Sequence, residues 1–230
     1  MATTITRPSS ATTARGSRGE GALGGAGAGG NARPRSAGQA RTRLLDAALN
    51  RFVAEGALSA TLEDIRRDAG VSTGALYHHF PDKPALAAAL YVELTAGFQE
   101  GFLGELRTHQ GAEQGVRAGV RFYLRWVSAN RDAAAFLLHE RPAEDAALRA
   151  LNRPFFAEVV AWWGTHRHYG ALRELPFDVI NALWLGPAQE YARHWIAGRG
   201  KRISGPVAEA LADAAWLALR AEPDERKEPR

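Results

Sequence analysis

The chain has 230 residues and a formal net charge of +4, with 29 Lys and Arg residues against 25 Asp and Glu residues. It contains no cysteine, which excludes a disulfide framework and thiolate metal sites. Its longest apolar run, residues 85–92, is far shorter than the roughly 18 residues that suggest a membrane span. We therefore expect a soluble, cytoplasmic protein that makes no contact with a membrane.

The first 38 residues differ in composition from the rest of the chain. They are rich in Gly, Ala, Ser, Thr and Arg and have almost no large apolar side chain, so we expect a disordered tail. Residues 1–43 contain seven Arg and one Glu, a net charge of +6, whereas the remaining residues carry a net charge of −2. We interpret the tail as solvated; the alternative is a basic arm that contacts DNA phosphates, with Arg41 near the first helix.

From Gln39 onward the apolar residues recur with helical periodicity and no strand pattern appears, which predicts an all-α fold. Residues 39–90 are expected to form a three-helix, helix-turn-helix domain, whose first helix ends at about Glu55 because Gly56 follows it. Residues 91–221 are expected to form a larger helical domain for ligand binding and dimerisation. Residues 222–230 are expected to be a charged tail.

Residues 61–83, TLEDIRRDAGVSTGALYHHFPDK, carry the start and stop signals of two short helices joined by a tight turn. Thr61 precedes Asp64 by three residues, as in a capping box, so a helix is predicted to begin there. Gly70 can adopt the left-handed conformation that ends a helix, and Val71 can turn inward behind it. Ser72 can then cap the next helix. This order of signals predicts a helix-turn-helix.

The second helix of this motif is predicted to be anchored by Leu76 and Phe80. Its exposed side carries short polar and aromatic residues, namely Thr73, Gly74, Tyr77, His78 and His79. These side chains can donate to phosphate oxygens and to base edges, as a helix in the DNA major groove requires. The net charge of residues 39–90 is zero, so the motif and not the charge carries this prediction.

Residues 39–90 closely resemble the DNA-binding domain of the TetR family of bacterial transcriptional regulators. The matching positions are Thr61, Asp64, Ile65, Ala69, Gly70, Val71, Ser72, Gly74, Leu76, Tyr77, His79, Phe80 and Lys83. The resemblance implies a homodimer that binds a palindromic operator in double-stranded DNA, most often as a repressor, and is released by a small-molecule effector.

Within that interpretation, the contacts with DNA divide into two groups. Thr61, Tyr77 and Lys83 would hold the domain on phosphates, and Thr73, Gly74 and His78 would lie nearest the bases. Ser72, His79 and Arg41 complete the candidate interface. Arg66 departs from the family pattern, in which many members carry a small residue, and is interpreted as a solvated or phosphate-facing arginine.

The larger domain is predicted to contain several long helices. Asp82 caps a helix that runs toward Leu106, with Pro84 in its first turn. Further helices are predicted at about residues 112–129, 131–139, 145–167, 176–197 and 206–220, which gives about nine in the whole chain. Pro187 inside the helix at 176–197 predicts a kink.

All six tryptophans lie in the second half of the chain, together with several Phe and Tyr residues. Such a concentration predicts either an apolar core and subunit interface or a pocket for an apolar or aromatic effector. The family resemblance favours a pocket. Helical spacing gives its candidate lining residues: Phe122, Trp126, Phe155, Val159 and Trp162.

The last two predicted helices each carry a stripe of apolar and small residues. The candidate dimer contacts are Trp184, Ala188, Tyr191 and Trp195 on one helix and Leu211, Ala214 and Ala218 on the other. These stripes could equally face the core of their own domain. A twofold dimer is favoured because it doubles the few DNA contacts that one helix-turn-helix can make.

No catalytic constellation, cofactor motif or metal-binding spacing is recognised, so we expect neither an enzyme nor a cofactor. Residues 70–74 fit the spacing of a hydrolase nucleophile elbow, but that motif requires a preceding strand. The alternative function is an all-helical small-molecule-binding protein, or an enzyme acting on an apolar substrate, that does not bind DNA.

Overall fold

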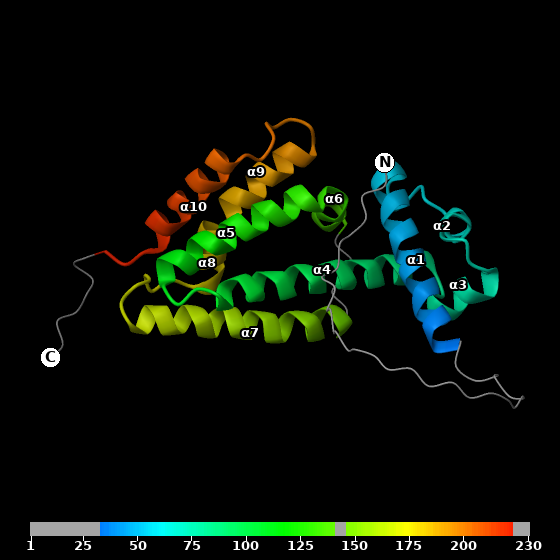
Figure 1. Cartoon of the computed structure of the whole chain (residues 1–230), viewed down its shortest axis with the longest axis horizontal. Coiled ribbons are helices and arrows are strands. Elements are labelled where there is room, and N and C mark those ends of the chain that lie inside the picture. Colours follow the sequence, from blue (N-terminus) through cyan, green and yellow to red (C-terminus); the bar gives the residue numbers. More distant parts are fainter. Residues whose placement is uncertain (1–32, 141–145, 223–230) are drawn as a thin grey trace, which may run out of the picture.

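The computed structural model describes residues 33–140 and 146–222 (Figure 1). The described helices are α1 (Arg33–Glu55), α2 (Leu62–Ala69), α3 (Thr73–His79), α4 (Lys83–Arg107), α5 (Ala112–Ala129), α6 (Arg131–His139), α7 (Ala146–His168), α8 (Phe177–Trp184), α9 (Gly186–Ile196) and α10 (Gly205–Leu219). The predicted all-α fold is confirmed. Among the described helices, none is both long and apolar enough to span a bilayer.

Two predicted boundaries differ from the structure. Helix α1 begins at Arg33, six residues before the predicted start at Gln39, so residues 33–38 are helical and not part of a tail. The rest of the predicted N-terminal tail lies outside the described residues, as does nearly all of the C-terminal tail. The single helix predicted at 176–197 is two helices that meet at Leu185, because Pro187 occupies the first turn of α9.

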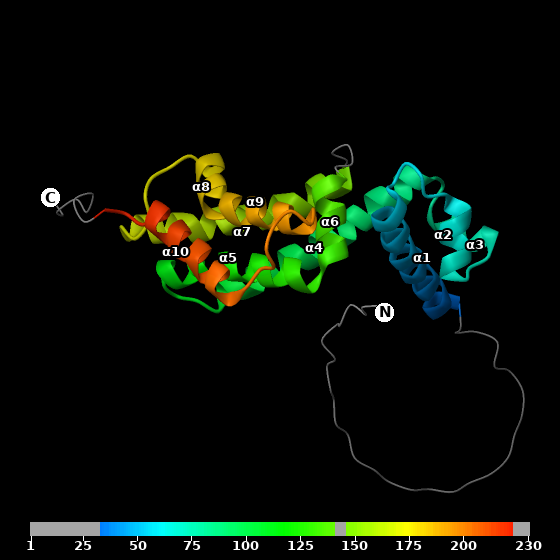
Figure 2. The same ribbon diagram turned by 90° about the horizontal axis from the view of Figure 1, so that it is seen from above.

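The helices form two units joined along α4. Helices α1, α2 and α3 gather around the first turns of α4, and the rest of α4 lies beside α5 and α7 in the second unit (Figure 1). Helix α10 packs on α5 at the far side. Seen from above, the first unit stands apart from the second, and α6 faces α1 across the junction (Figure 2).

The core of the first unit, here called the N-terminal core, is mainly aliphatic. Its fully buried side chains include Leu44, Ile65, Leu76 and Leu86. It also contains a residue from the second unit, since Phe136 of α6 is 3% exposed and stacks on Phe52 of α1 at a ring separation of 5.7 Å. Helix α6 is therefore part of both units.

The core of the second unit, here called the C-terminal core, is aromatic and closely packed on bare helix backbone. A methyl group on Gly115 would lie 2.3 Å from Trp162, and one on Gly119 would lie 2.9 Å from Trp184. These two glycines are one helical turn apart on α5, so the two indoles lie side by side over it, stacked at 5.8 Å. Any larger residue at either glycine would collide with a tryptophan ring.

Candidate nucleic-acid interface

The turn between α2 and α3 is built by the local signals that its sequence carries. Thr61 accepts a hydrogen bond from the Asp64 amide at 3.1 Å, and Ser72 accepts one from the Ala75 amide at 3.2 Å. Gly70 has a φ of 61°, in the left-handed region that favours glycine, and Val71 behind it is buried. These contacts fix the angle between α2 and α3.

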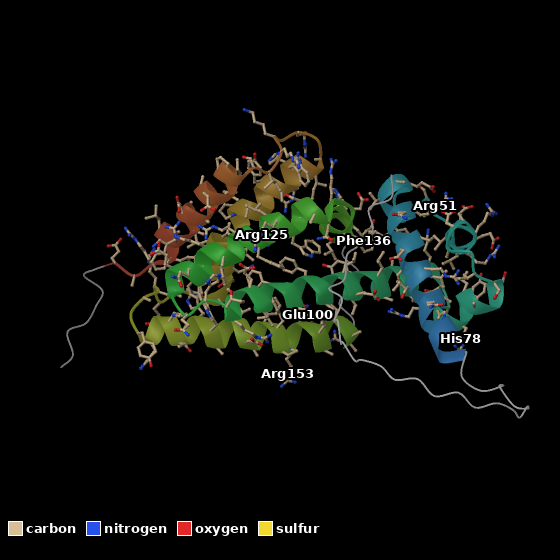
Figure 3. The ribbon with its side chains drawn as sticks, in the orientation of Figure 1. Arg51, His78, Glu100, Arg125, Phe136 and Arg153 are labelled. Carbon is tan, nitrogen blue, oxygen red and sulfur yellow. The ribbon has the colours of Figure 1, made fainter. Side chains whose placement is uncertain are left out.

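Helix α3 is anchored on one side and open on the other. Leu76 is buried, and Phe80, which ends the helix, is buried too. The exposed residues are Ser72, Thr73, Gly74, Tyr77 and His78, and Tyr77 keeps 55% of its surface free. His79 is only half-buried, with its ring 5.2 Å from that of His78. Four of the five residues predicted on the exposed side are thus exposed, and His79 is the exception. His78 lies at the outer end of the first unit (Figure 3).

Three of the predicted phosphate-contacting residues also have partners within the chain. The Lys83 ammonium donates to the carbonyl oxygens of Leu58 and Ala60, at 2.8 and 3.0 Å, and keeps a third N–H. Arg41 pairs with Glu93 of α4 at 2.6 Å, and the Thr61 hydroxyl donates to Asp64. Their contacts with DNA remain predictions.

Arg66 has a structural role that the sequence-based interpretation did not anticipate. Its guanidinium donates to the Val71 carbonyl at 2.7 Å and forms a bidentate pair with Glu63. That pairing lowers the pKa of the Glu63 carboxyl, chiefly through the hydrogen bond with Arg66. Arg66 thus ties the end of α2 to the turn. The spacing of Glu63 and Arg66 could have suggested their ion pair, but not the bond to Val71.

Two further arginines on α1 border the motif. Arg51 forms a bidentate pair with Asp68 of α2, with distances of 2.6 and 3.1 Å, and so holds α1 against α2. Arg43 is exposed, and its guanidinium lies beside Gly70 at the turn. Arg43 thus places an exposed positive charge beside the turn between α2 and α3.

The five predicted effector contacts lie in one region of the second unit. Val159 is buried in the C-terminal core, and the half-buried rings of Phe122, Trp126, Phe155 and Trp162 pack against that core. Trp126 also packs against the N-terminal core, so it lies between the two units. The structure brings the five together as packed side chains, and their role in effector binding remains a prediction.

Two open grooves of the described surface are lined by other residues. One lies between α5 and α10, where Arg117 and Trp216 contribute to its walls. The other runs along the start of α7 beside Arg153 and Phe156. Neither groove contains one of the five predicted effector contacts.

The predicted dimer contacts divide into buried and accessible residues. Trp184 is 3% exposed and donates to the Val116 carbonyl at 2.8 Å, and Ala188 is 1% exposed. The prediction for these two residues is wrong, because the stripe that they share faces the core of their own subunit. Tyr191, Trp195, Leu211 and Ala218 are half-buried, and Ala214 is exposed.

The exposed apolar residues nearby were not predicted as dimer contacts. Leu217 of α10 is 59% exposed and Val179 of α8 is 38% exposed. Periodicity alone could not distinguish them from the buried stripe, because it shows which residues share a face and not what covers that face. Within residues 33–140 and 146–222, no group of three or more metal-ligating side chains is found.

An all-helical chain with this capped helix-turn-helix at one end and a larger helical unit behind it has the architecture of the helix-turn-helix class of DNA-binding proteins. Residues 44–90 match the family model described as "Bacterial regulatory proteins, tetR family". This match confirms the predicted resemblance of residues 39–90 to the DNA-binding domain of the TetR family.

Individual relatives agree with this assignment. The transcriptional regulator SrpR of Pseudomonas putida is 53% identical over 47 residues, which are 20% of this chain and 22% of SrpR. The match thus spans less than a quarter of that relative. The transcriptional regulator BetI of Escherichia coli is 29% identical over 179 residues, which are 77% of this chain and 80% of BetI. These relatives are regulators and not enzymes, in agreement with the sequence-based prediction.

A solved structure shows the same fold along nearly its whole length. A TetR family transcription regulator from Marinobacter aquaeolei VT8 superposes with a TM-score of 0.72 at 16% identity, covering 82% of this chain and 99% of that one. The similarity of fold therefore includes the second unit.

Proposed function

We propose that this protein is a ligand-responsive transcriptional repressor, which binds a palindromic DNA operator as a homodimer and is released by a small apolar or aromatic effector. The observation that carries the proposal is the open face of α3. Leu76 and Phe80 hold this helix to the core, while Thr73, Tyr77 and His78 face solvent. A helix that served only for packing would not keep this set of polar and aromatic groups outward.

On DNA, the N-terminal part of α3 enters the major groove. Thr73, Gly74 and His78 lie nearest the base edges, and Tyr77 with Ser72 and His79 contacts the flanking phosphates. Thr61 and Lys83 add phosphate contacts at the starts of α2 and α4. In a twofold dimer the two α3 helices would reach successive major grooves, roughly 34 Å apart.

Dimerisation is assigned to the accessible side of α8, α9 and α10. Leu217 and Val179 are the large apolar side chains there that their own subunit leaves exposed. Ala214 lies on the same helix as Leu217 and is small enough to permit close helix approach. The partly exposed Tyr191 and Trp195 extend this surface along α9.

The effector signal passes through two connections between the units, α4 and α6. Phe136 of α6 packs on Phe52 of α1, and the guanidinium of Arg131, at the start of α6, lies 5.1 Å from the Trp195 ring of α9. Trp126 packs on both cores. An effector that shifts α6 relative to α9 would therefore turn α1 and α3 with it. A coupling of about 1 to 3 kcal/mol would lower operator affinity roughly 5- to 150-fold.

The test is selection of bound sequences from a random duplex library by the full-length protein, followed by titration at physiological salt. We expect an inverted repeat, bound at least about a thousandfold more tightly than shuffled DNA. Enrichment of a single half-site would contradict the dimer. Weak, salt-sensitive binding without enrichment would contradict sequence-specific regulation and favour the alternative of a helical protein that binds small molecules only.

A further inference from the structure

The C-terminal core contains one buried hydrogen-bond donor that has no acceptor among the described residues. Trp163 of α7 is 4% exposed, and none of the described residues accepts a hydrogen bond from its indole N–H. Burying an unpaired donor is unfavourable, which is why buried N–H groups are nearly always paired. The neighbouring Trp184 shows the ordinary case, with its N–H bonded to a carbonyl.

The surroundings of this N–H form an aromatic cradle. The Trp163 ring lies 5.6 Å from that of Trp184 and 6.1 Å from that of Trp162. Trp162 in turn rests on the bare backbone at Gly115, and its own indole is only half-buried. Trp162 is therefore the most exposed of these three indoles.

The same region is unsuited to an ionised ligand. Among the described residues no charged side chain is buried, so no buried charge is available as a counter-ion. Burial raises the pKa of Tyr123 to about 12 and lowers the pKa of His166 from its usual value, so both groups stay neutral at pH 7. Transferring a charged molecule into such surroundings without a partner is strongly unfavourable.

We propose that the effector is an uncharged, flat apolar molecule with a hydrogen-bond acceptor, such as a ketone oxygen, which binds beside Trp163 and accepts its indole N–H. The inference rests on the proposed function, because it names the chemical class of that effector. The acceptor supplies the bond that the folded chain leaves unmade, and the stacked tryptophan rings cover the flat body of the molecule.

Three probes with the same ring system test this class on the full-length protein without DNA: methyl naphthyl ketone, ethylnaphthalene and naphthoate. Affinities are measured by calorimetric titration. The ketone should bind about tenfold more tightly than the hydrocarbon, which has the same ring system and no acceptor, because only the ketone satisfies the N–H. Naphthoate should bind most weakly. Equal binding of ketone and hydrocarbon, tightest binding of naphthoate, or no binding by any probe would overturn the proposal.

A variant tests whether the Trp163 N–H causes the preference for the ketone over the hydrocarbon. Trp163→Phe replaces the indole with a smaller aromatic ring that has no donor, so the ketone and the hydrocarbon should bind within about twofold of each other. Trp216→Phe, which removes an indole N–H on α10 outside the cradle, is the matched control and should keep the preference. A ketone preference that survives Trp163→Phe would overturn the assignment.

Proton–nitrogen NMR of the wild-type protein gives an independent readout if Trp163→Phe does not fold. The Trp163 indole N–H resonance should shift downfield when the ketone binds and stay in place with ethylnaphthalene. A resonance that the ketone leaves unmoved would mean that an internal water already accepts the bond, and would contradict the proposal. If instead the ketone preference holds but DNA selection yields no operator, the proposed regulatory function fails and the ligand site stands.

Discussion

The two units of the molecule are stabilised in different ways. The N-terminal unit has two short helices of 8 and 7 residues, set by side-chain caps and a left-handed glycine over an aliphatic core. The C-terminal unit has helices of up to 25 residues, held by tryptophan rings that lie on bare glycine backbone. The first arrangement fixes the direction of one exposed helix. The second places closely packed aromatic rings against the backbone of α5.

The comparison also shows where the two units pack against each other. Phe136 is the point at which a helix of the C-terminal unit enters the N-terminal core, and Figure 3 shows it at the junction between α6 and α1. Trp126 is the residue that packs on both cores. The following predictions test the difference between the units and the contact that joins them.

The largest effect is expected at the junction. Phe136→Ala should destabilise the protein by about 3 to 5 kcal/mol, because it leaves a cavity between α6 and α1 in the N-terminal core. Phe156→Ala, which truncates a 42% exposed phenylalanine on α7, is the control and should cost far less. Chemical denaturation measures both. Equal costs would mean that Phe136 does not join the units.

The ring-on-glycine packing gives the next largest effect. Gly115→Ala should cost about 1 to 3 kcal/mol, because the added methyl group meets the Trp162 ring and the ring must shift. Gly104→Ala on α4 is the control, since a methyl group there meets nothing within 4 Å. That change should be neutral or slightly stabilising, as alanine favours helix. Chemical denaturation should show Gly115→Ala to be clearly less stable than Gly104→Ala. Similar stabilities would contradict the close packing of Trp162 on Gly115.

The third prediction compares the stability lost when each of the two buried indoles, Trp184 and Trp163, is replaced by phenylalanine. The expected difference is smaller than the two effects above. Trp184→Phe loses a hydrogen bond to Val116, whereas Trp163→Phe loses none in the described structure. Trp184→Phe should therefore be the more destabilising by about 1 kcal/mol. Thermal and chemical denaturation of both variants provide the comparison. If Trp163→Phe were the costlier change, its N–H would already have an acceptor in the free protein.

The smallest effect concerns acid stability. The Arg51 hydrogen bond lowers the pKa of the Asp68 carboxyl, so this pair stabilises the fold above about pH 4, the ordinary range of Asp, and less as the carboxyl protonates below it. Arg51→Met should reduce the fall in Tm between pH 7 and pH 3. Arg153→Met, which changes an exposed arginine on α7, is the control. If the Tm of Arg51→Met fell as much between pH 7 and pH 3 as that of the wild-type protein, the ion pair would contribute nothing to stability.

The sequence predicts the N-terminal unit well because its signals are local. Thr61, Gly70, Ser72 and Asp82 each act within three or four residues, through a cap or a turn, and all four take the predicted roles. The ends of most longer helices are likewise predicted to within a residue or two. The early start of α1 is the exception, since the Gly- and Arg-rich residues before Gln39 give no helical pattern.

The candidate site in the C-terminal unit depends on contacts between distant segments. Nothing local indicates that Gly115 leaves room for Trp162, or that Arg66 reaches the Val71 carbonyl. The apolar stripe through Trp184 and Ala188 is visible in the sequence, but periodicity does not say whether the same subunit or a second one covers it. The aromatic composition therefore predicts a core and not its arrangement.

The central claim is that the open face of α3 reads DNA, and one matched titration tests it most directly. Tyr77 and Tyr169 are both exposed tyrosines, at 55% and 79%, but only Tyr77 lies on α3. On the duplex enriched by selection, Tyr77→Ala should lower affinity at least about tenfold, because a phosphate contact is lost, while Tyr169→Ala stays within about twofold of wild type. Equal affinity of Tyr77→Ala and the wild-type protein would contradict the account.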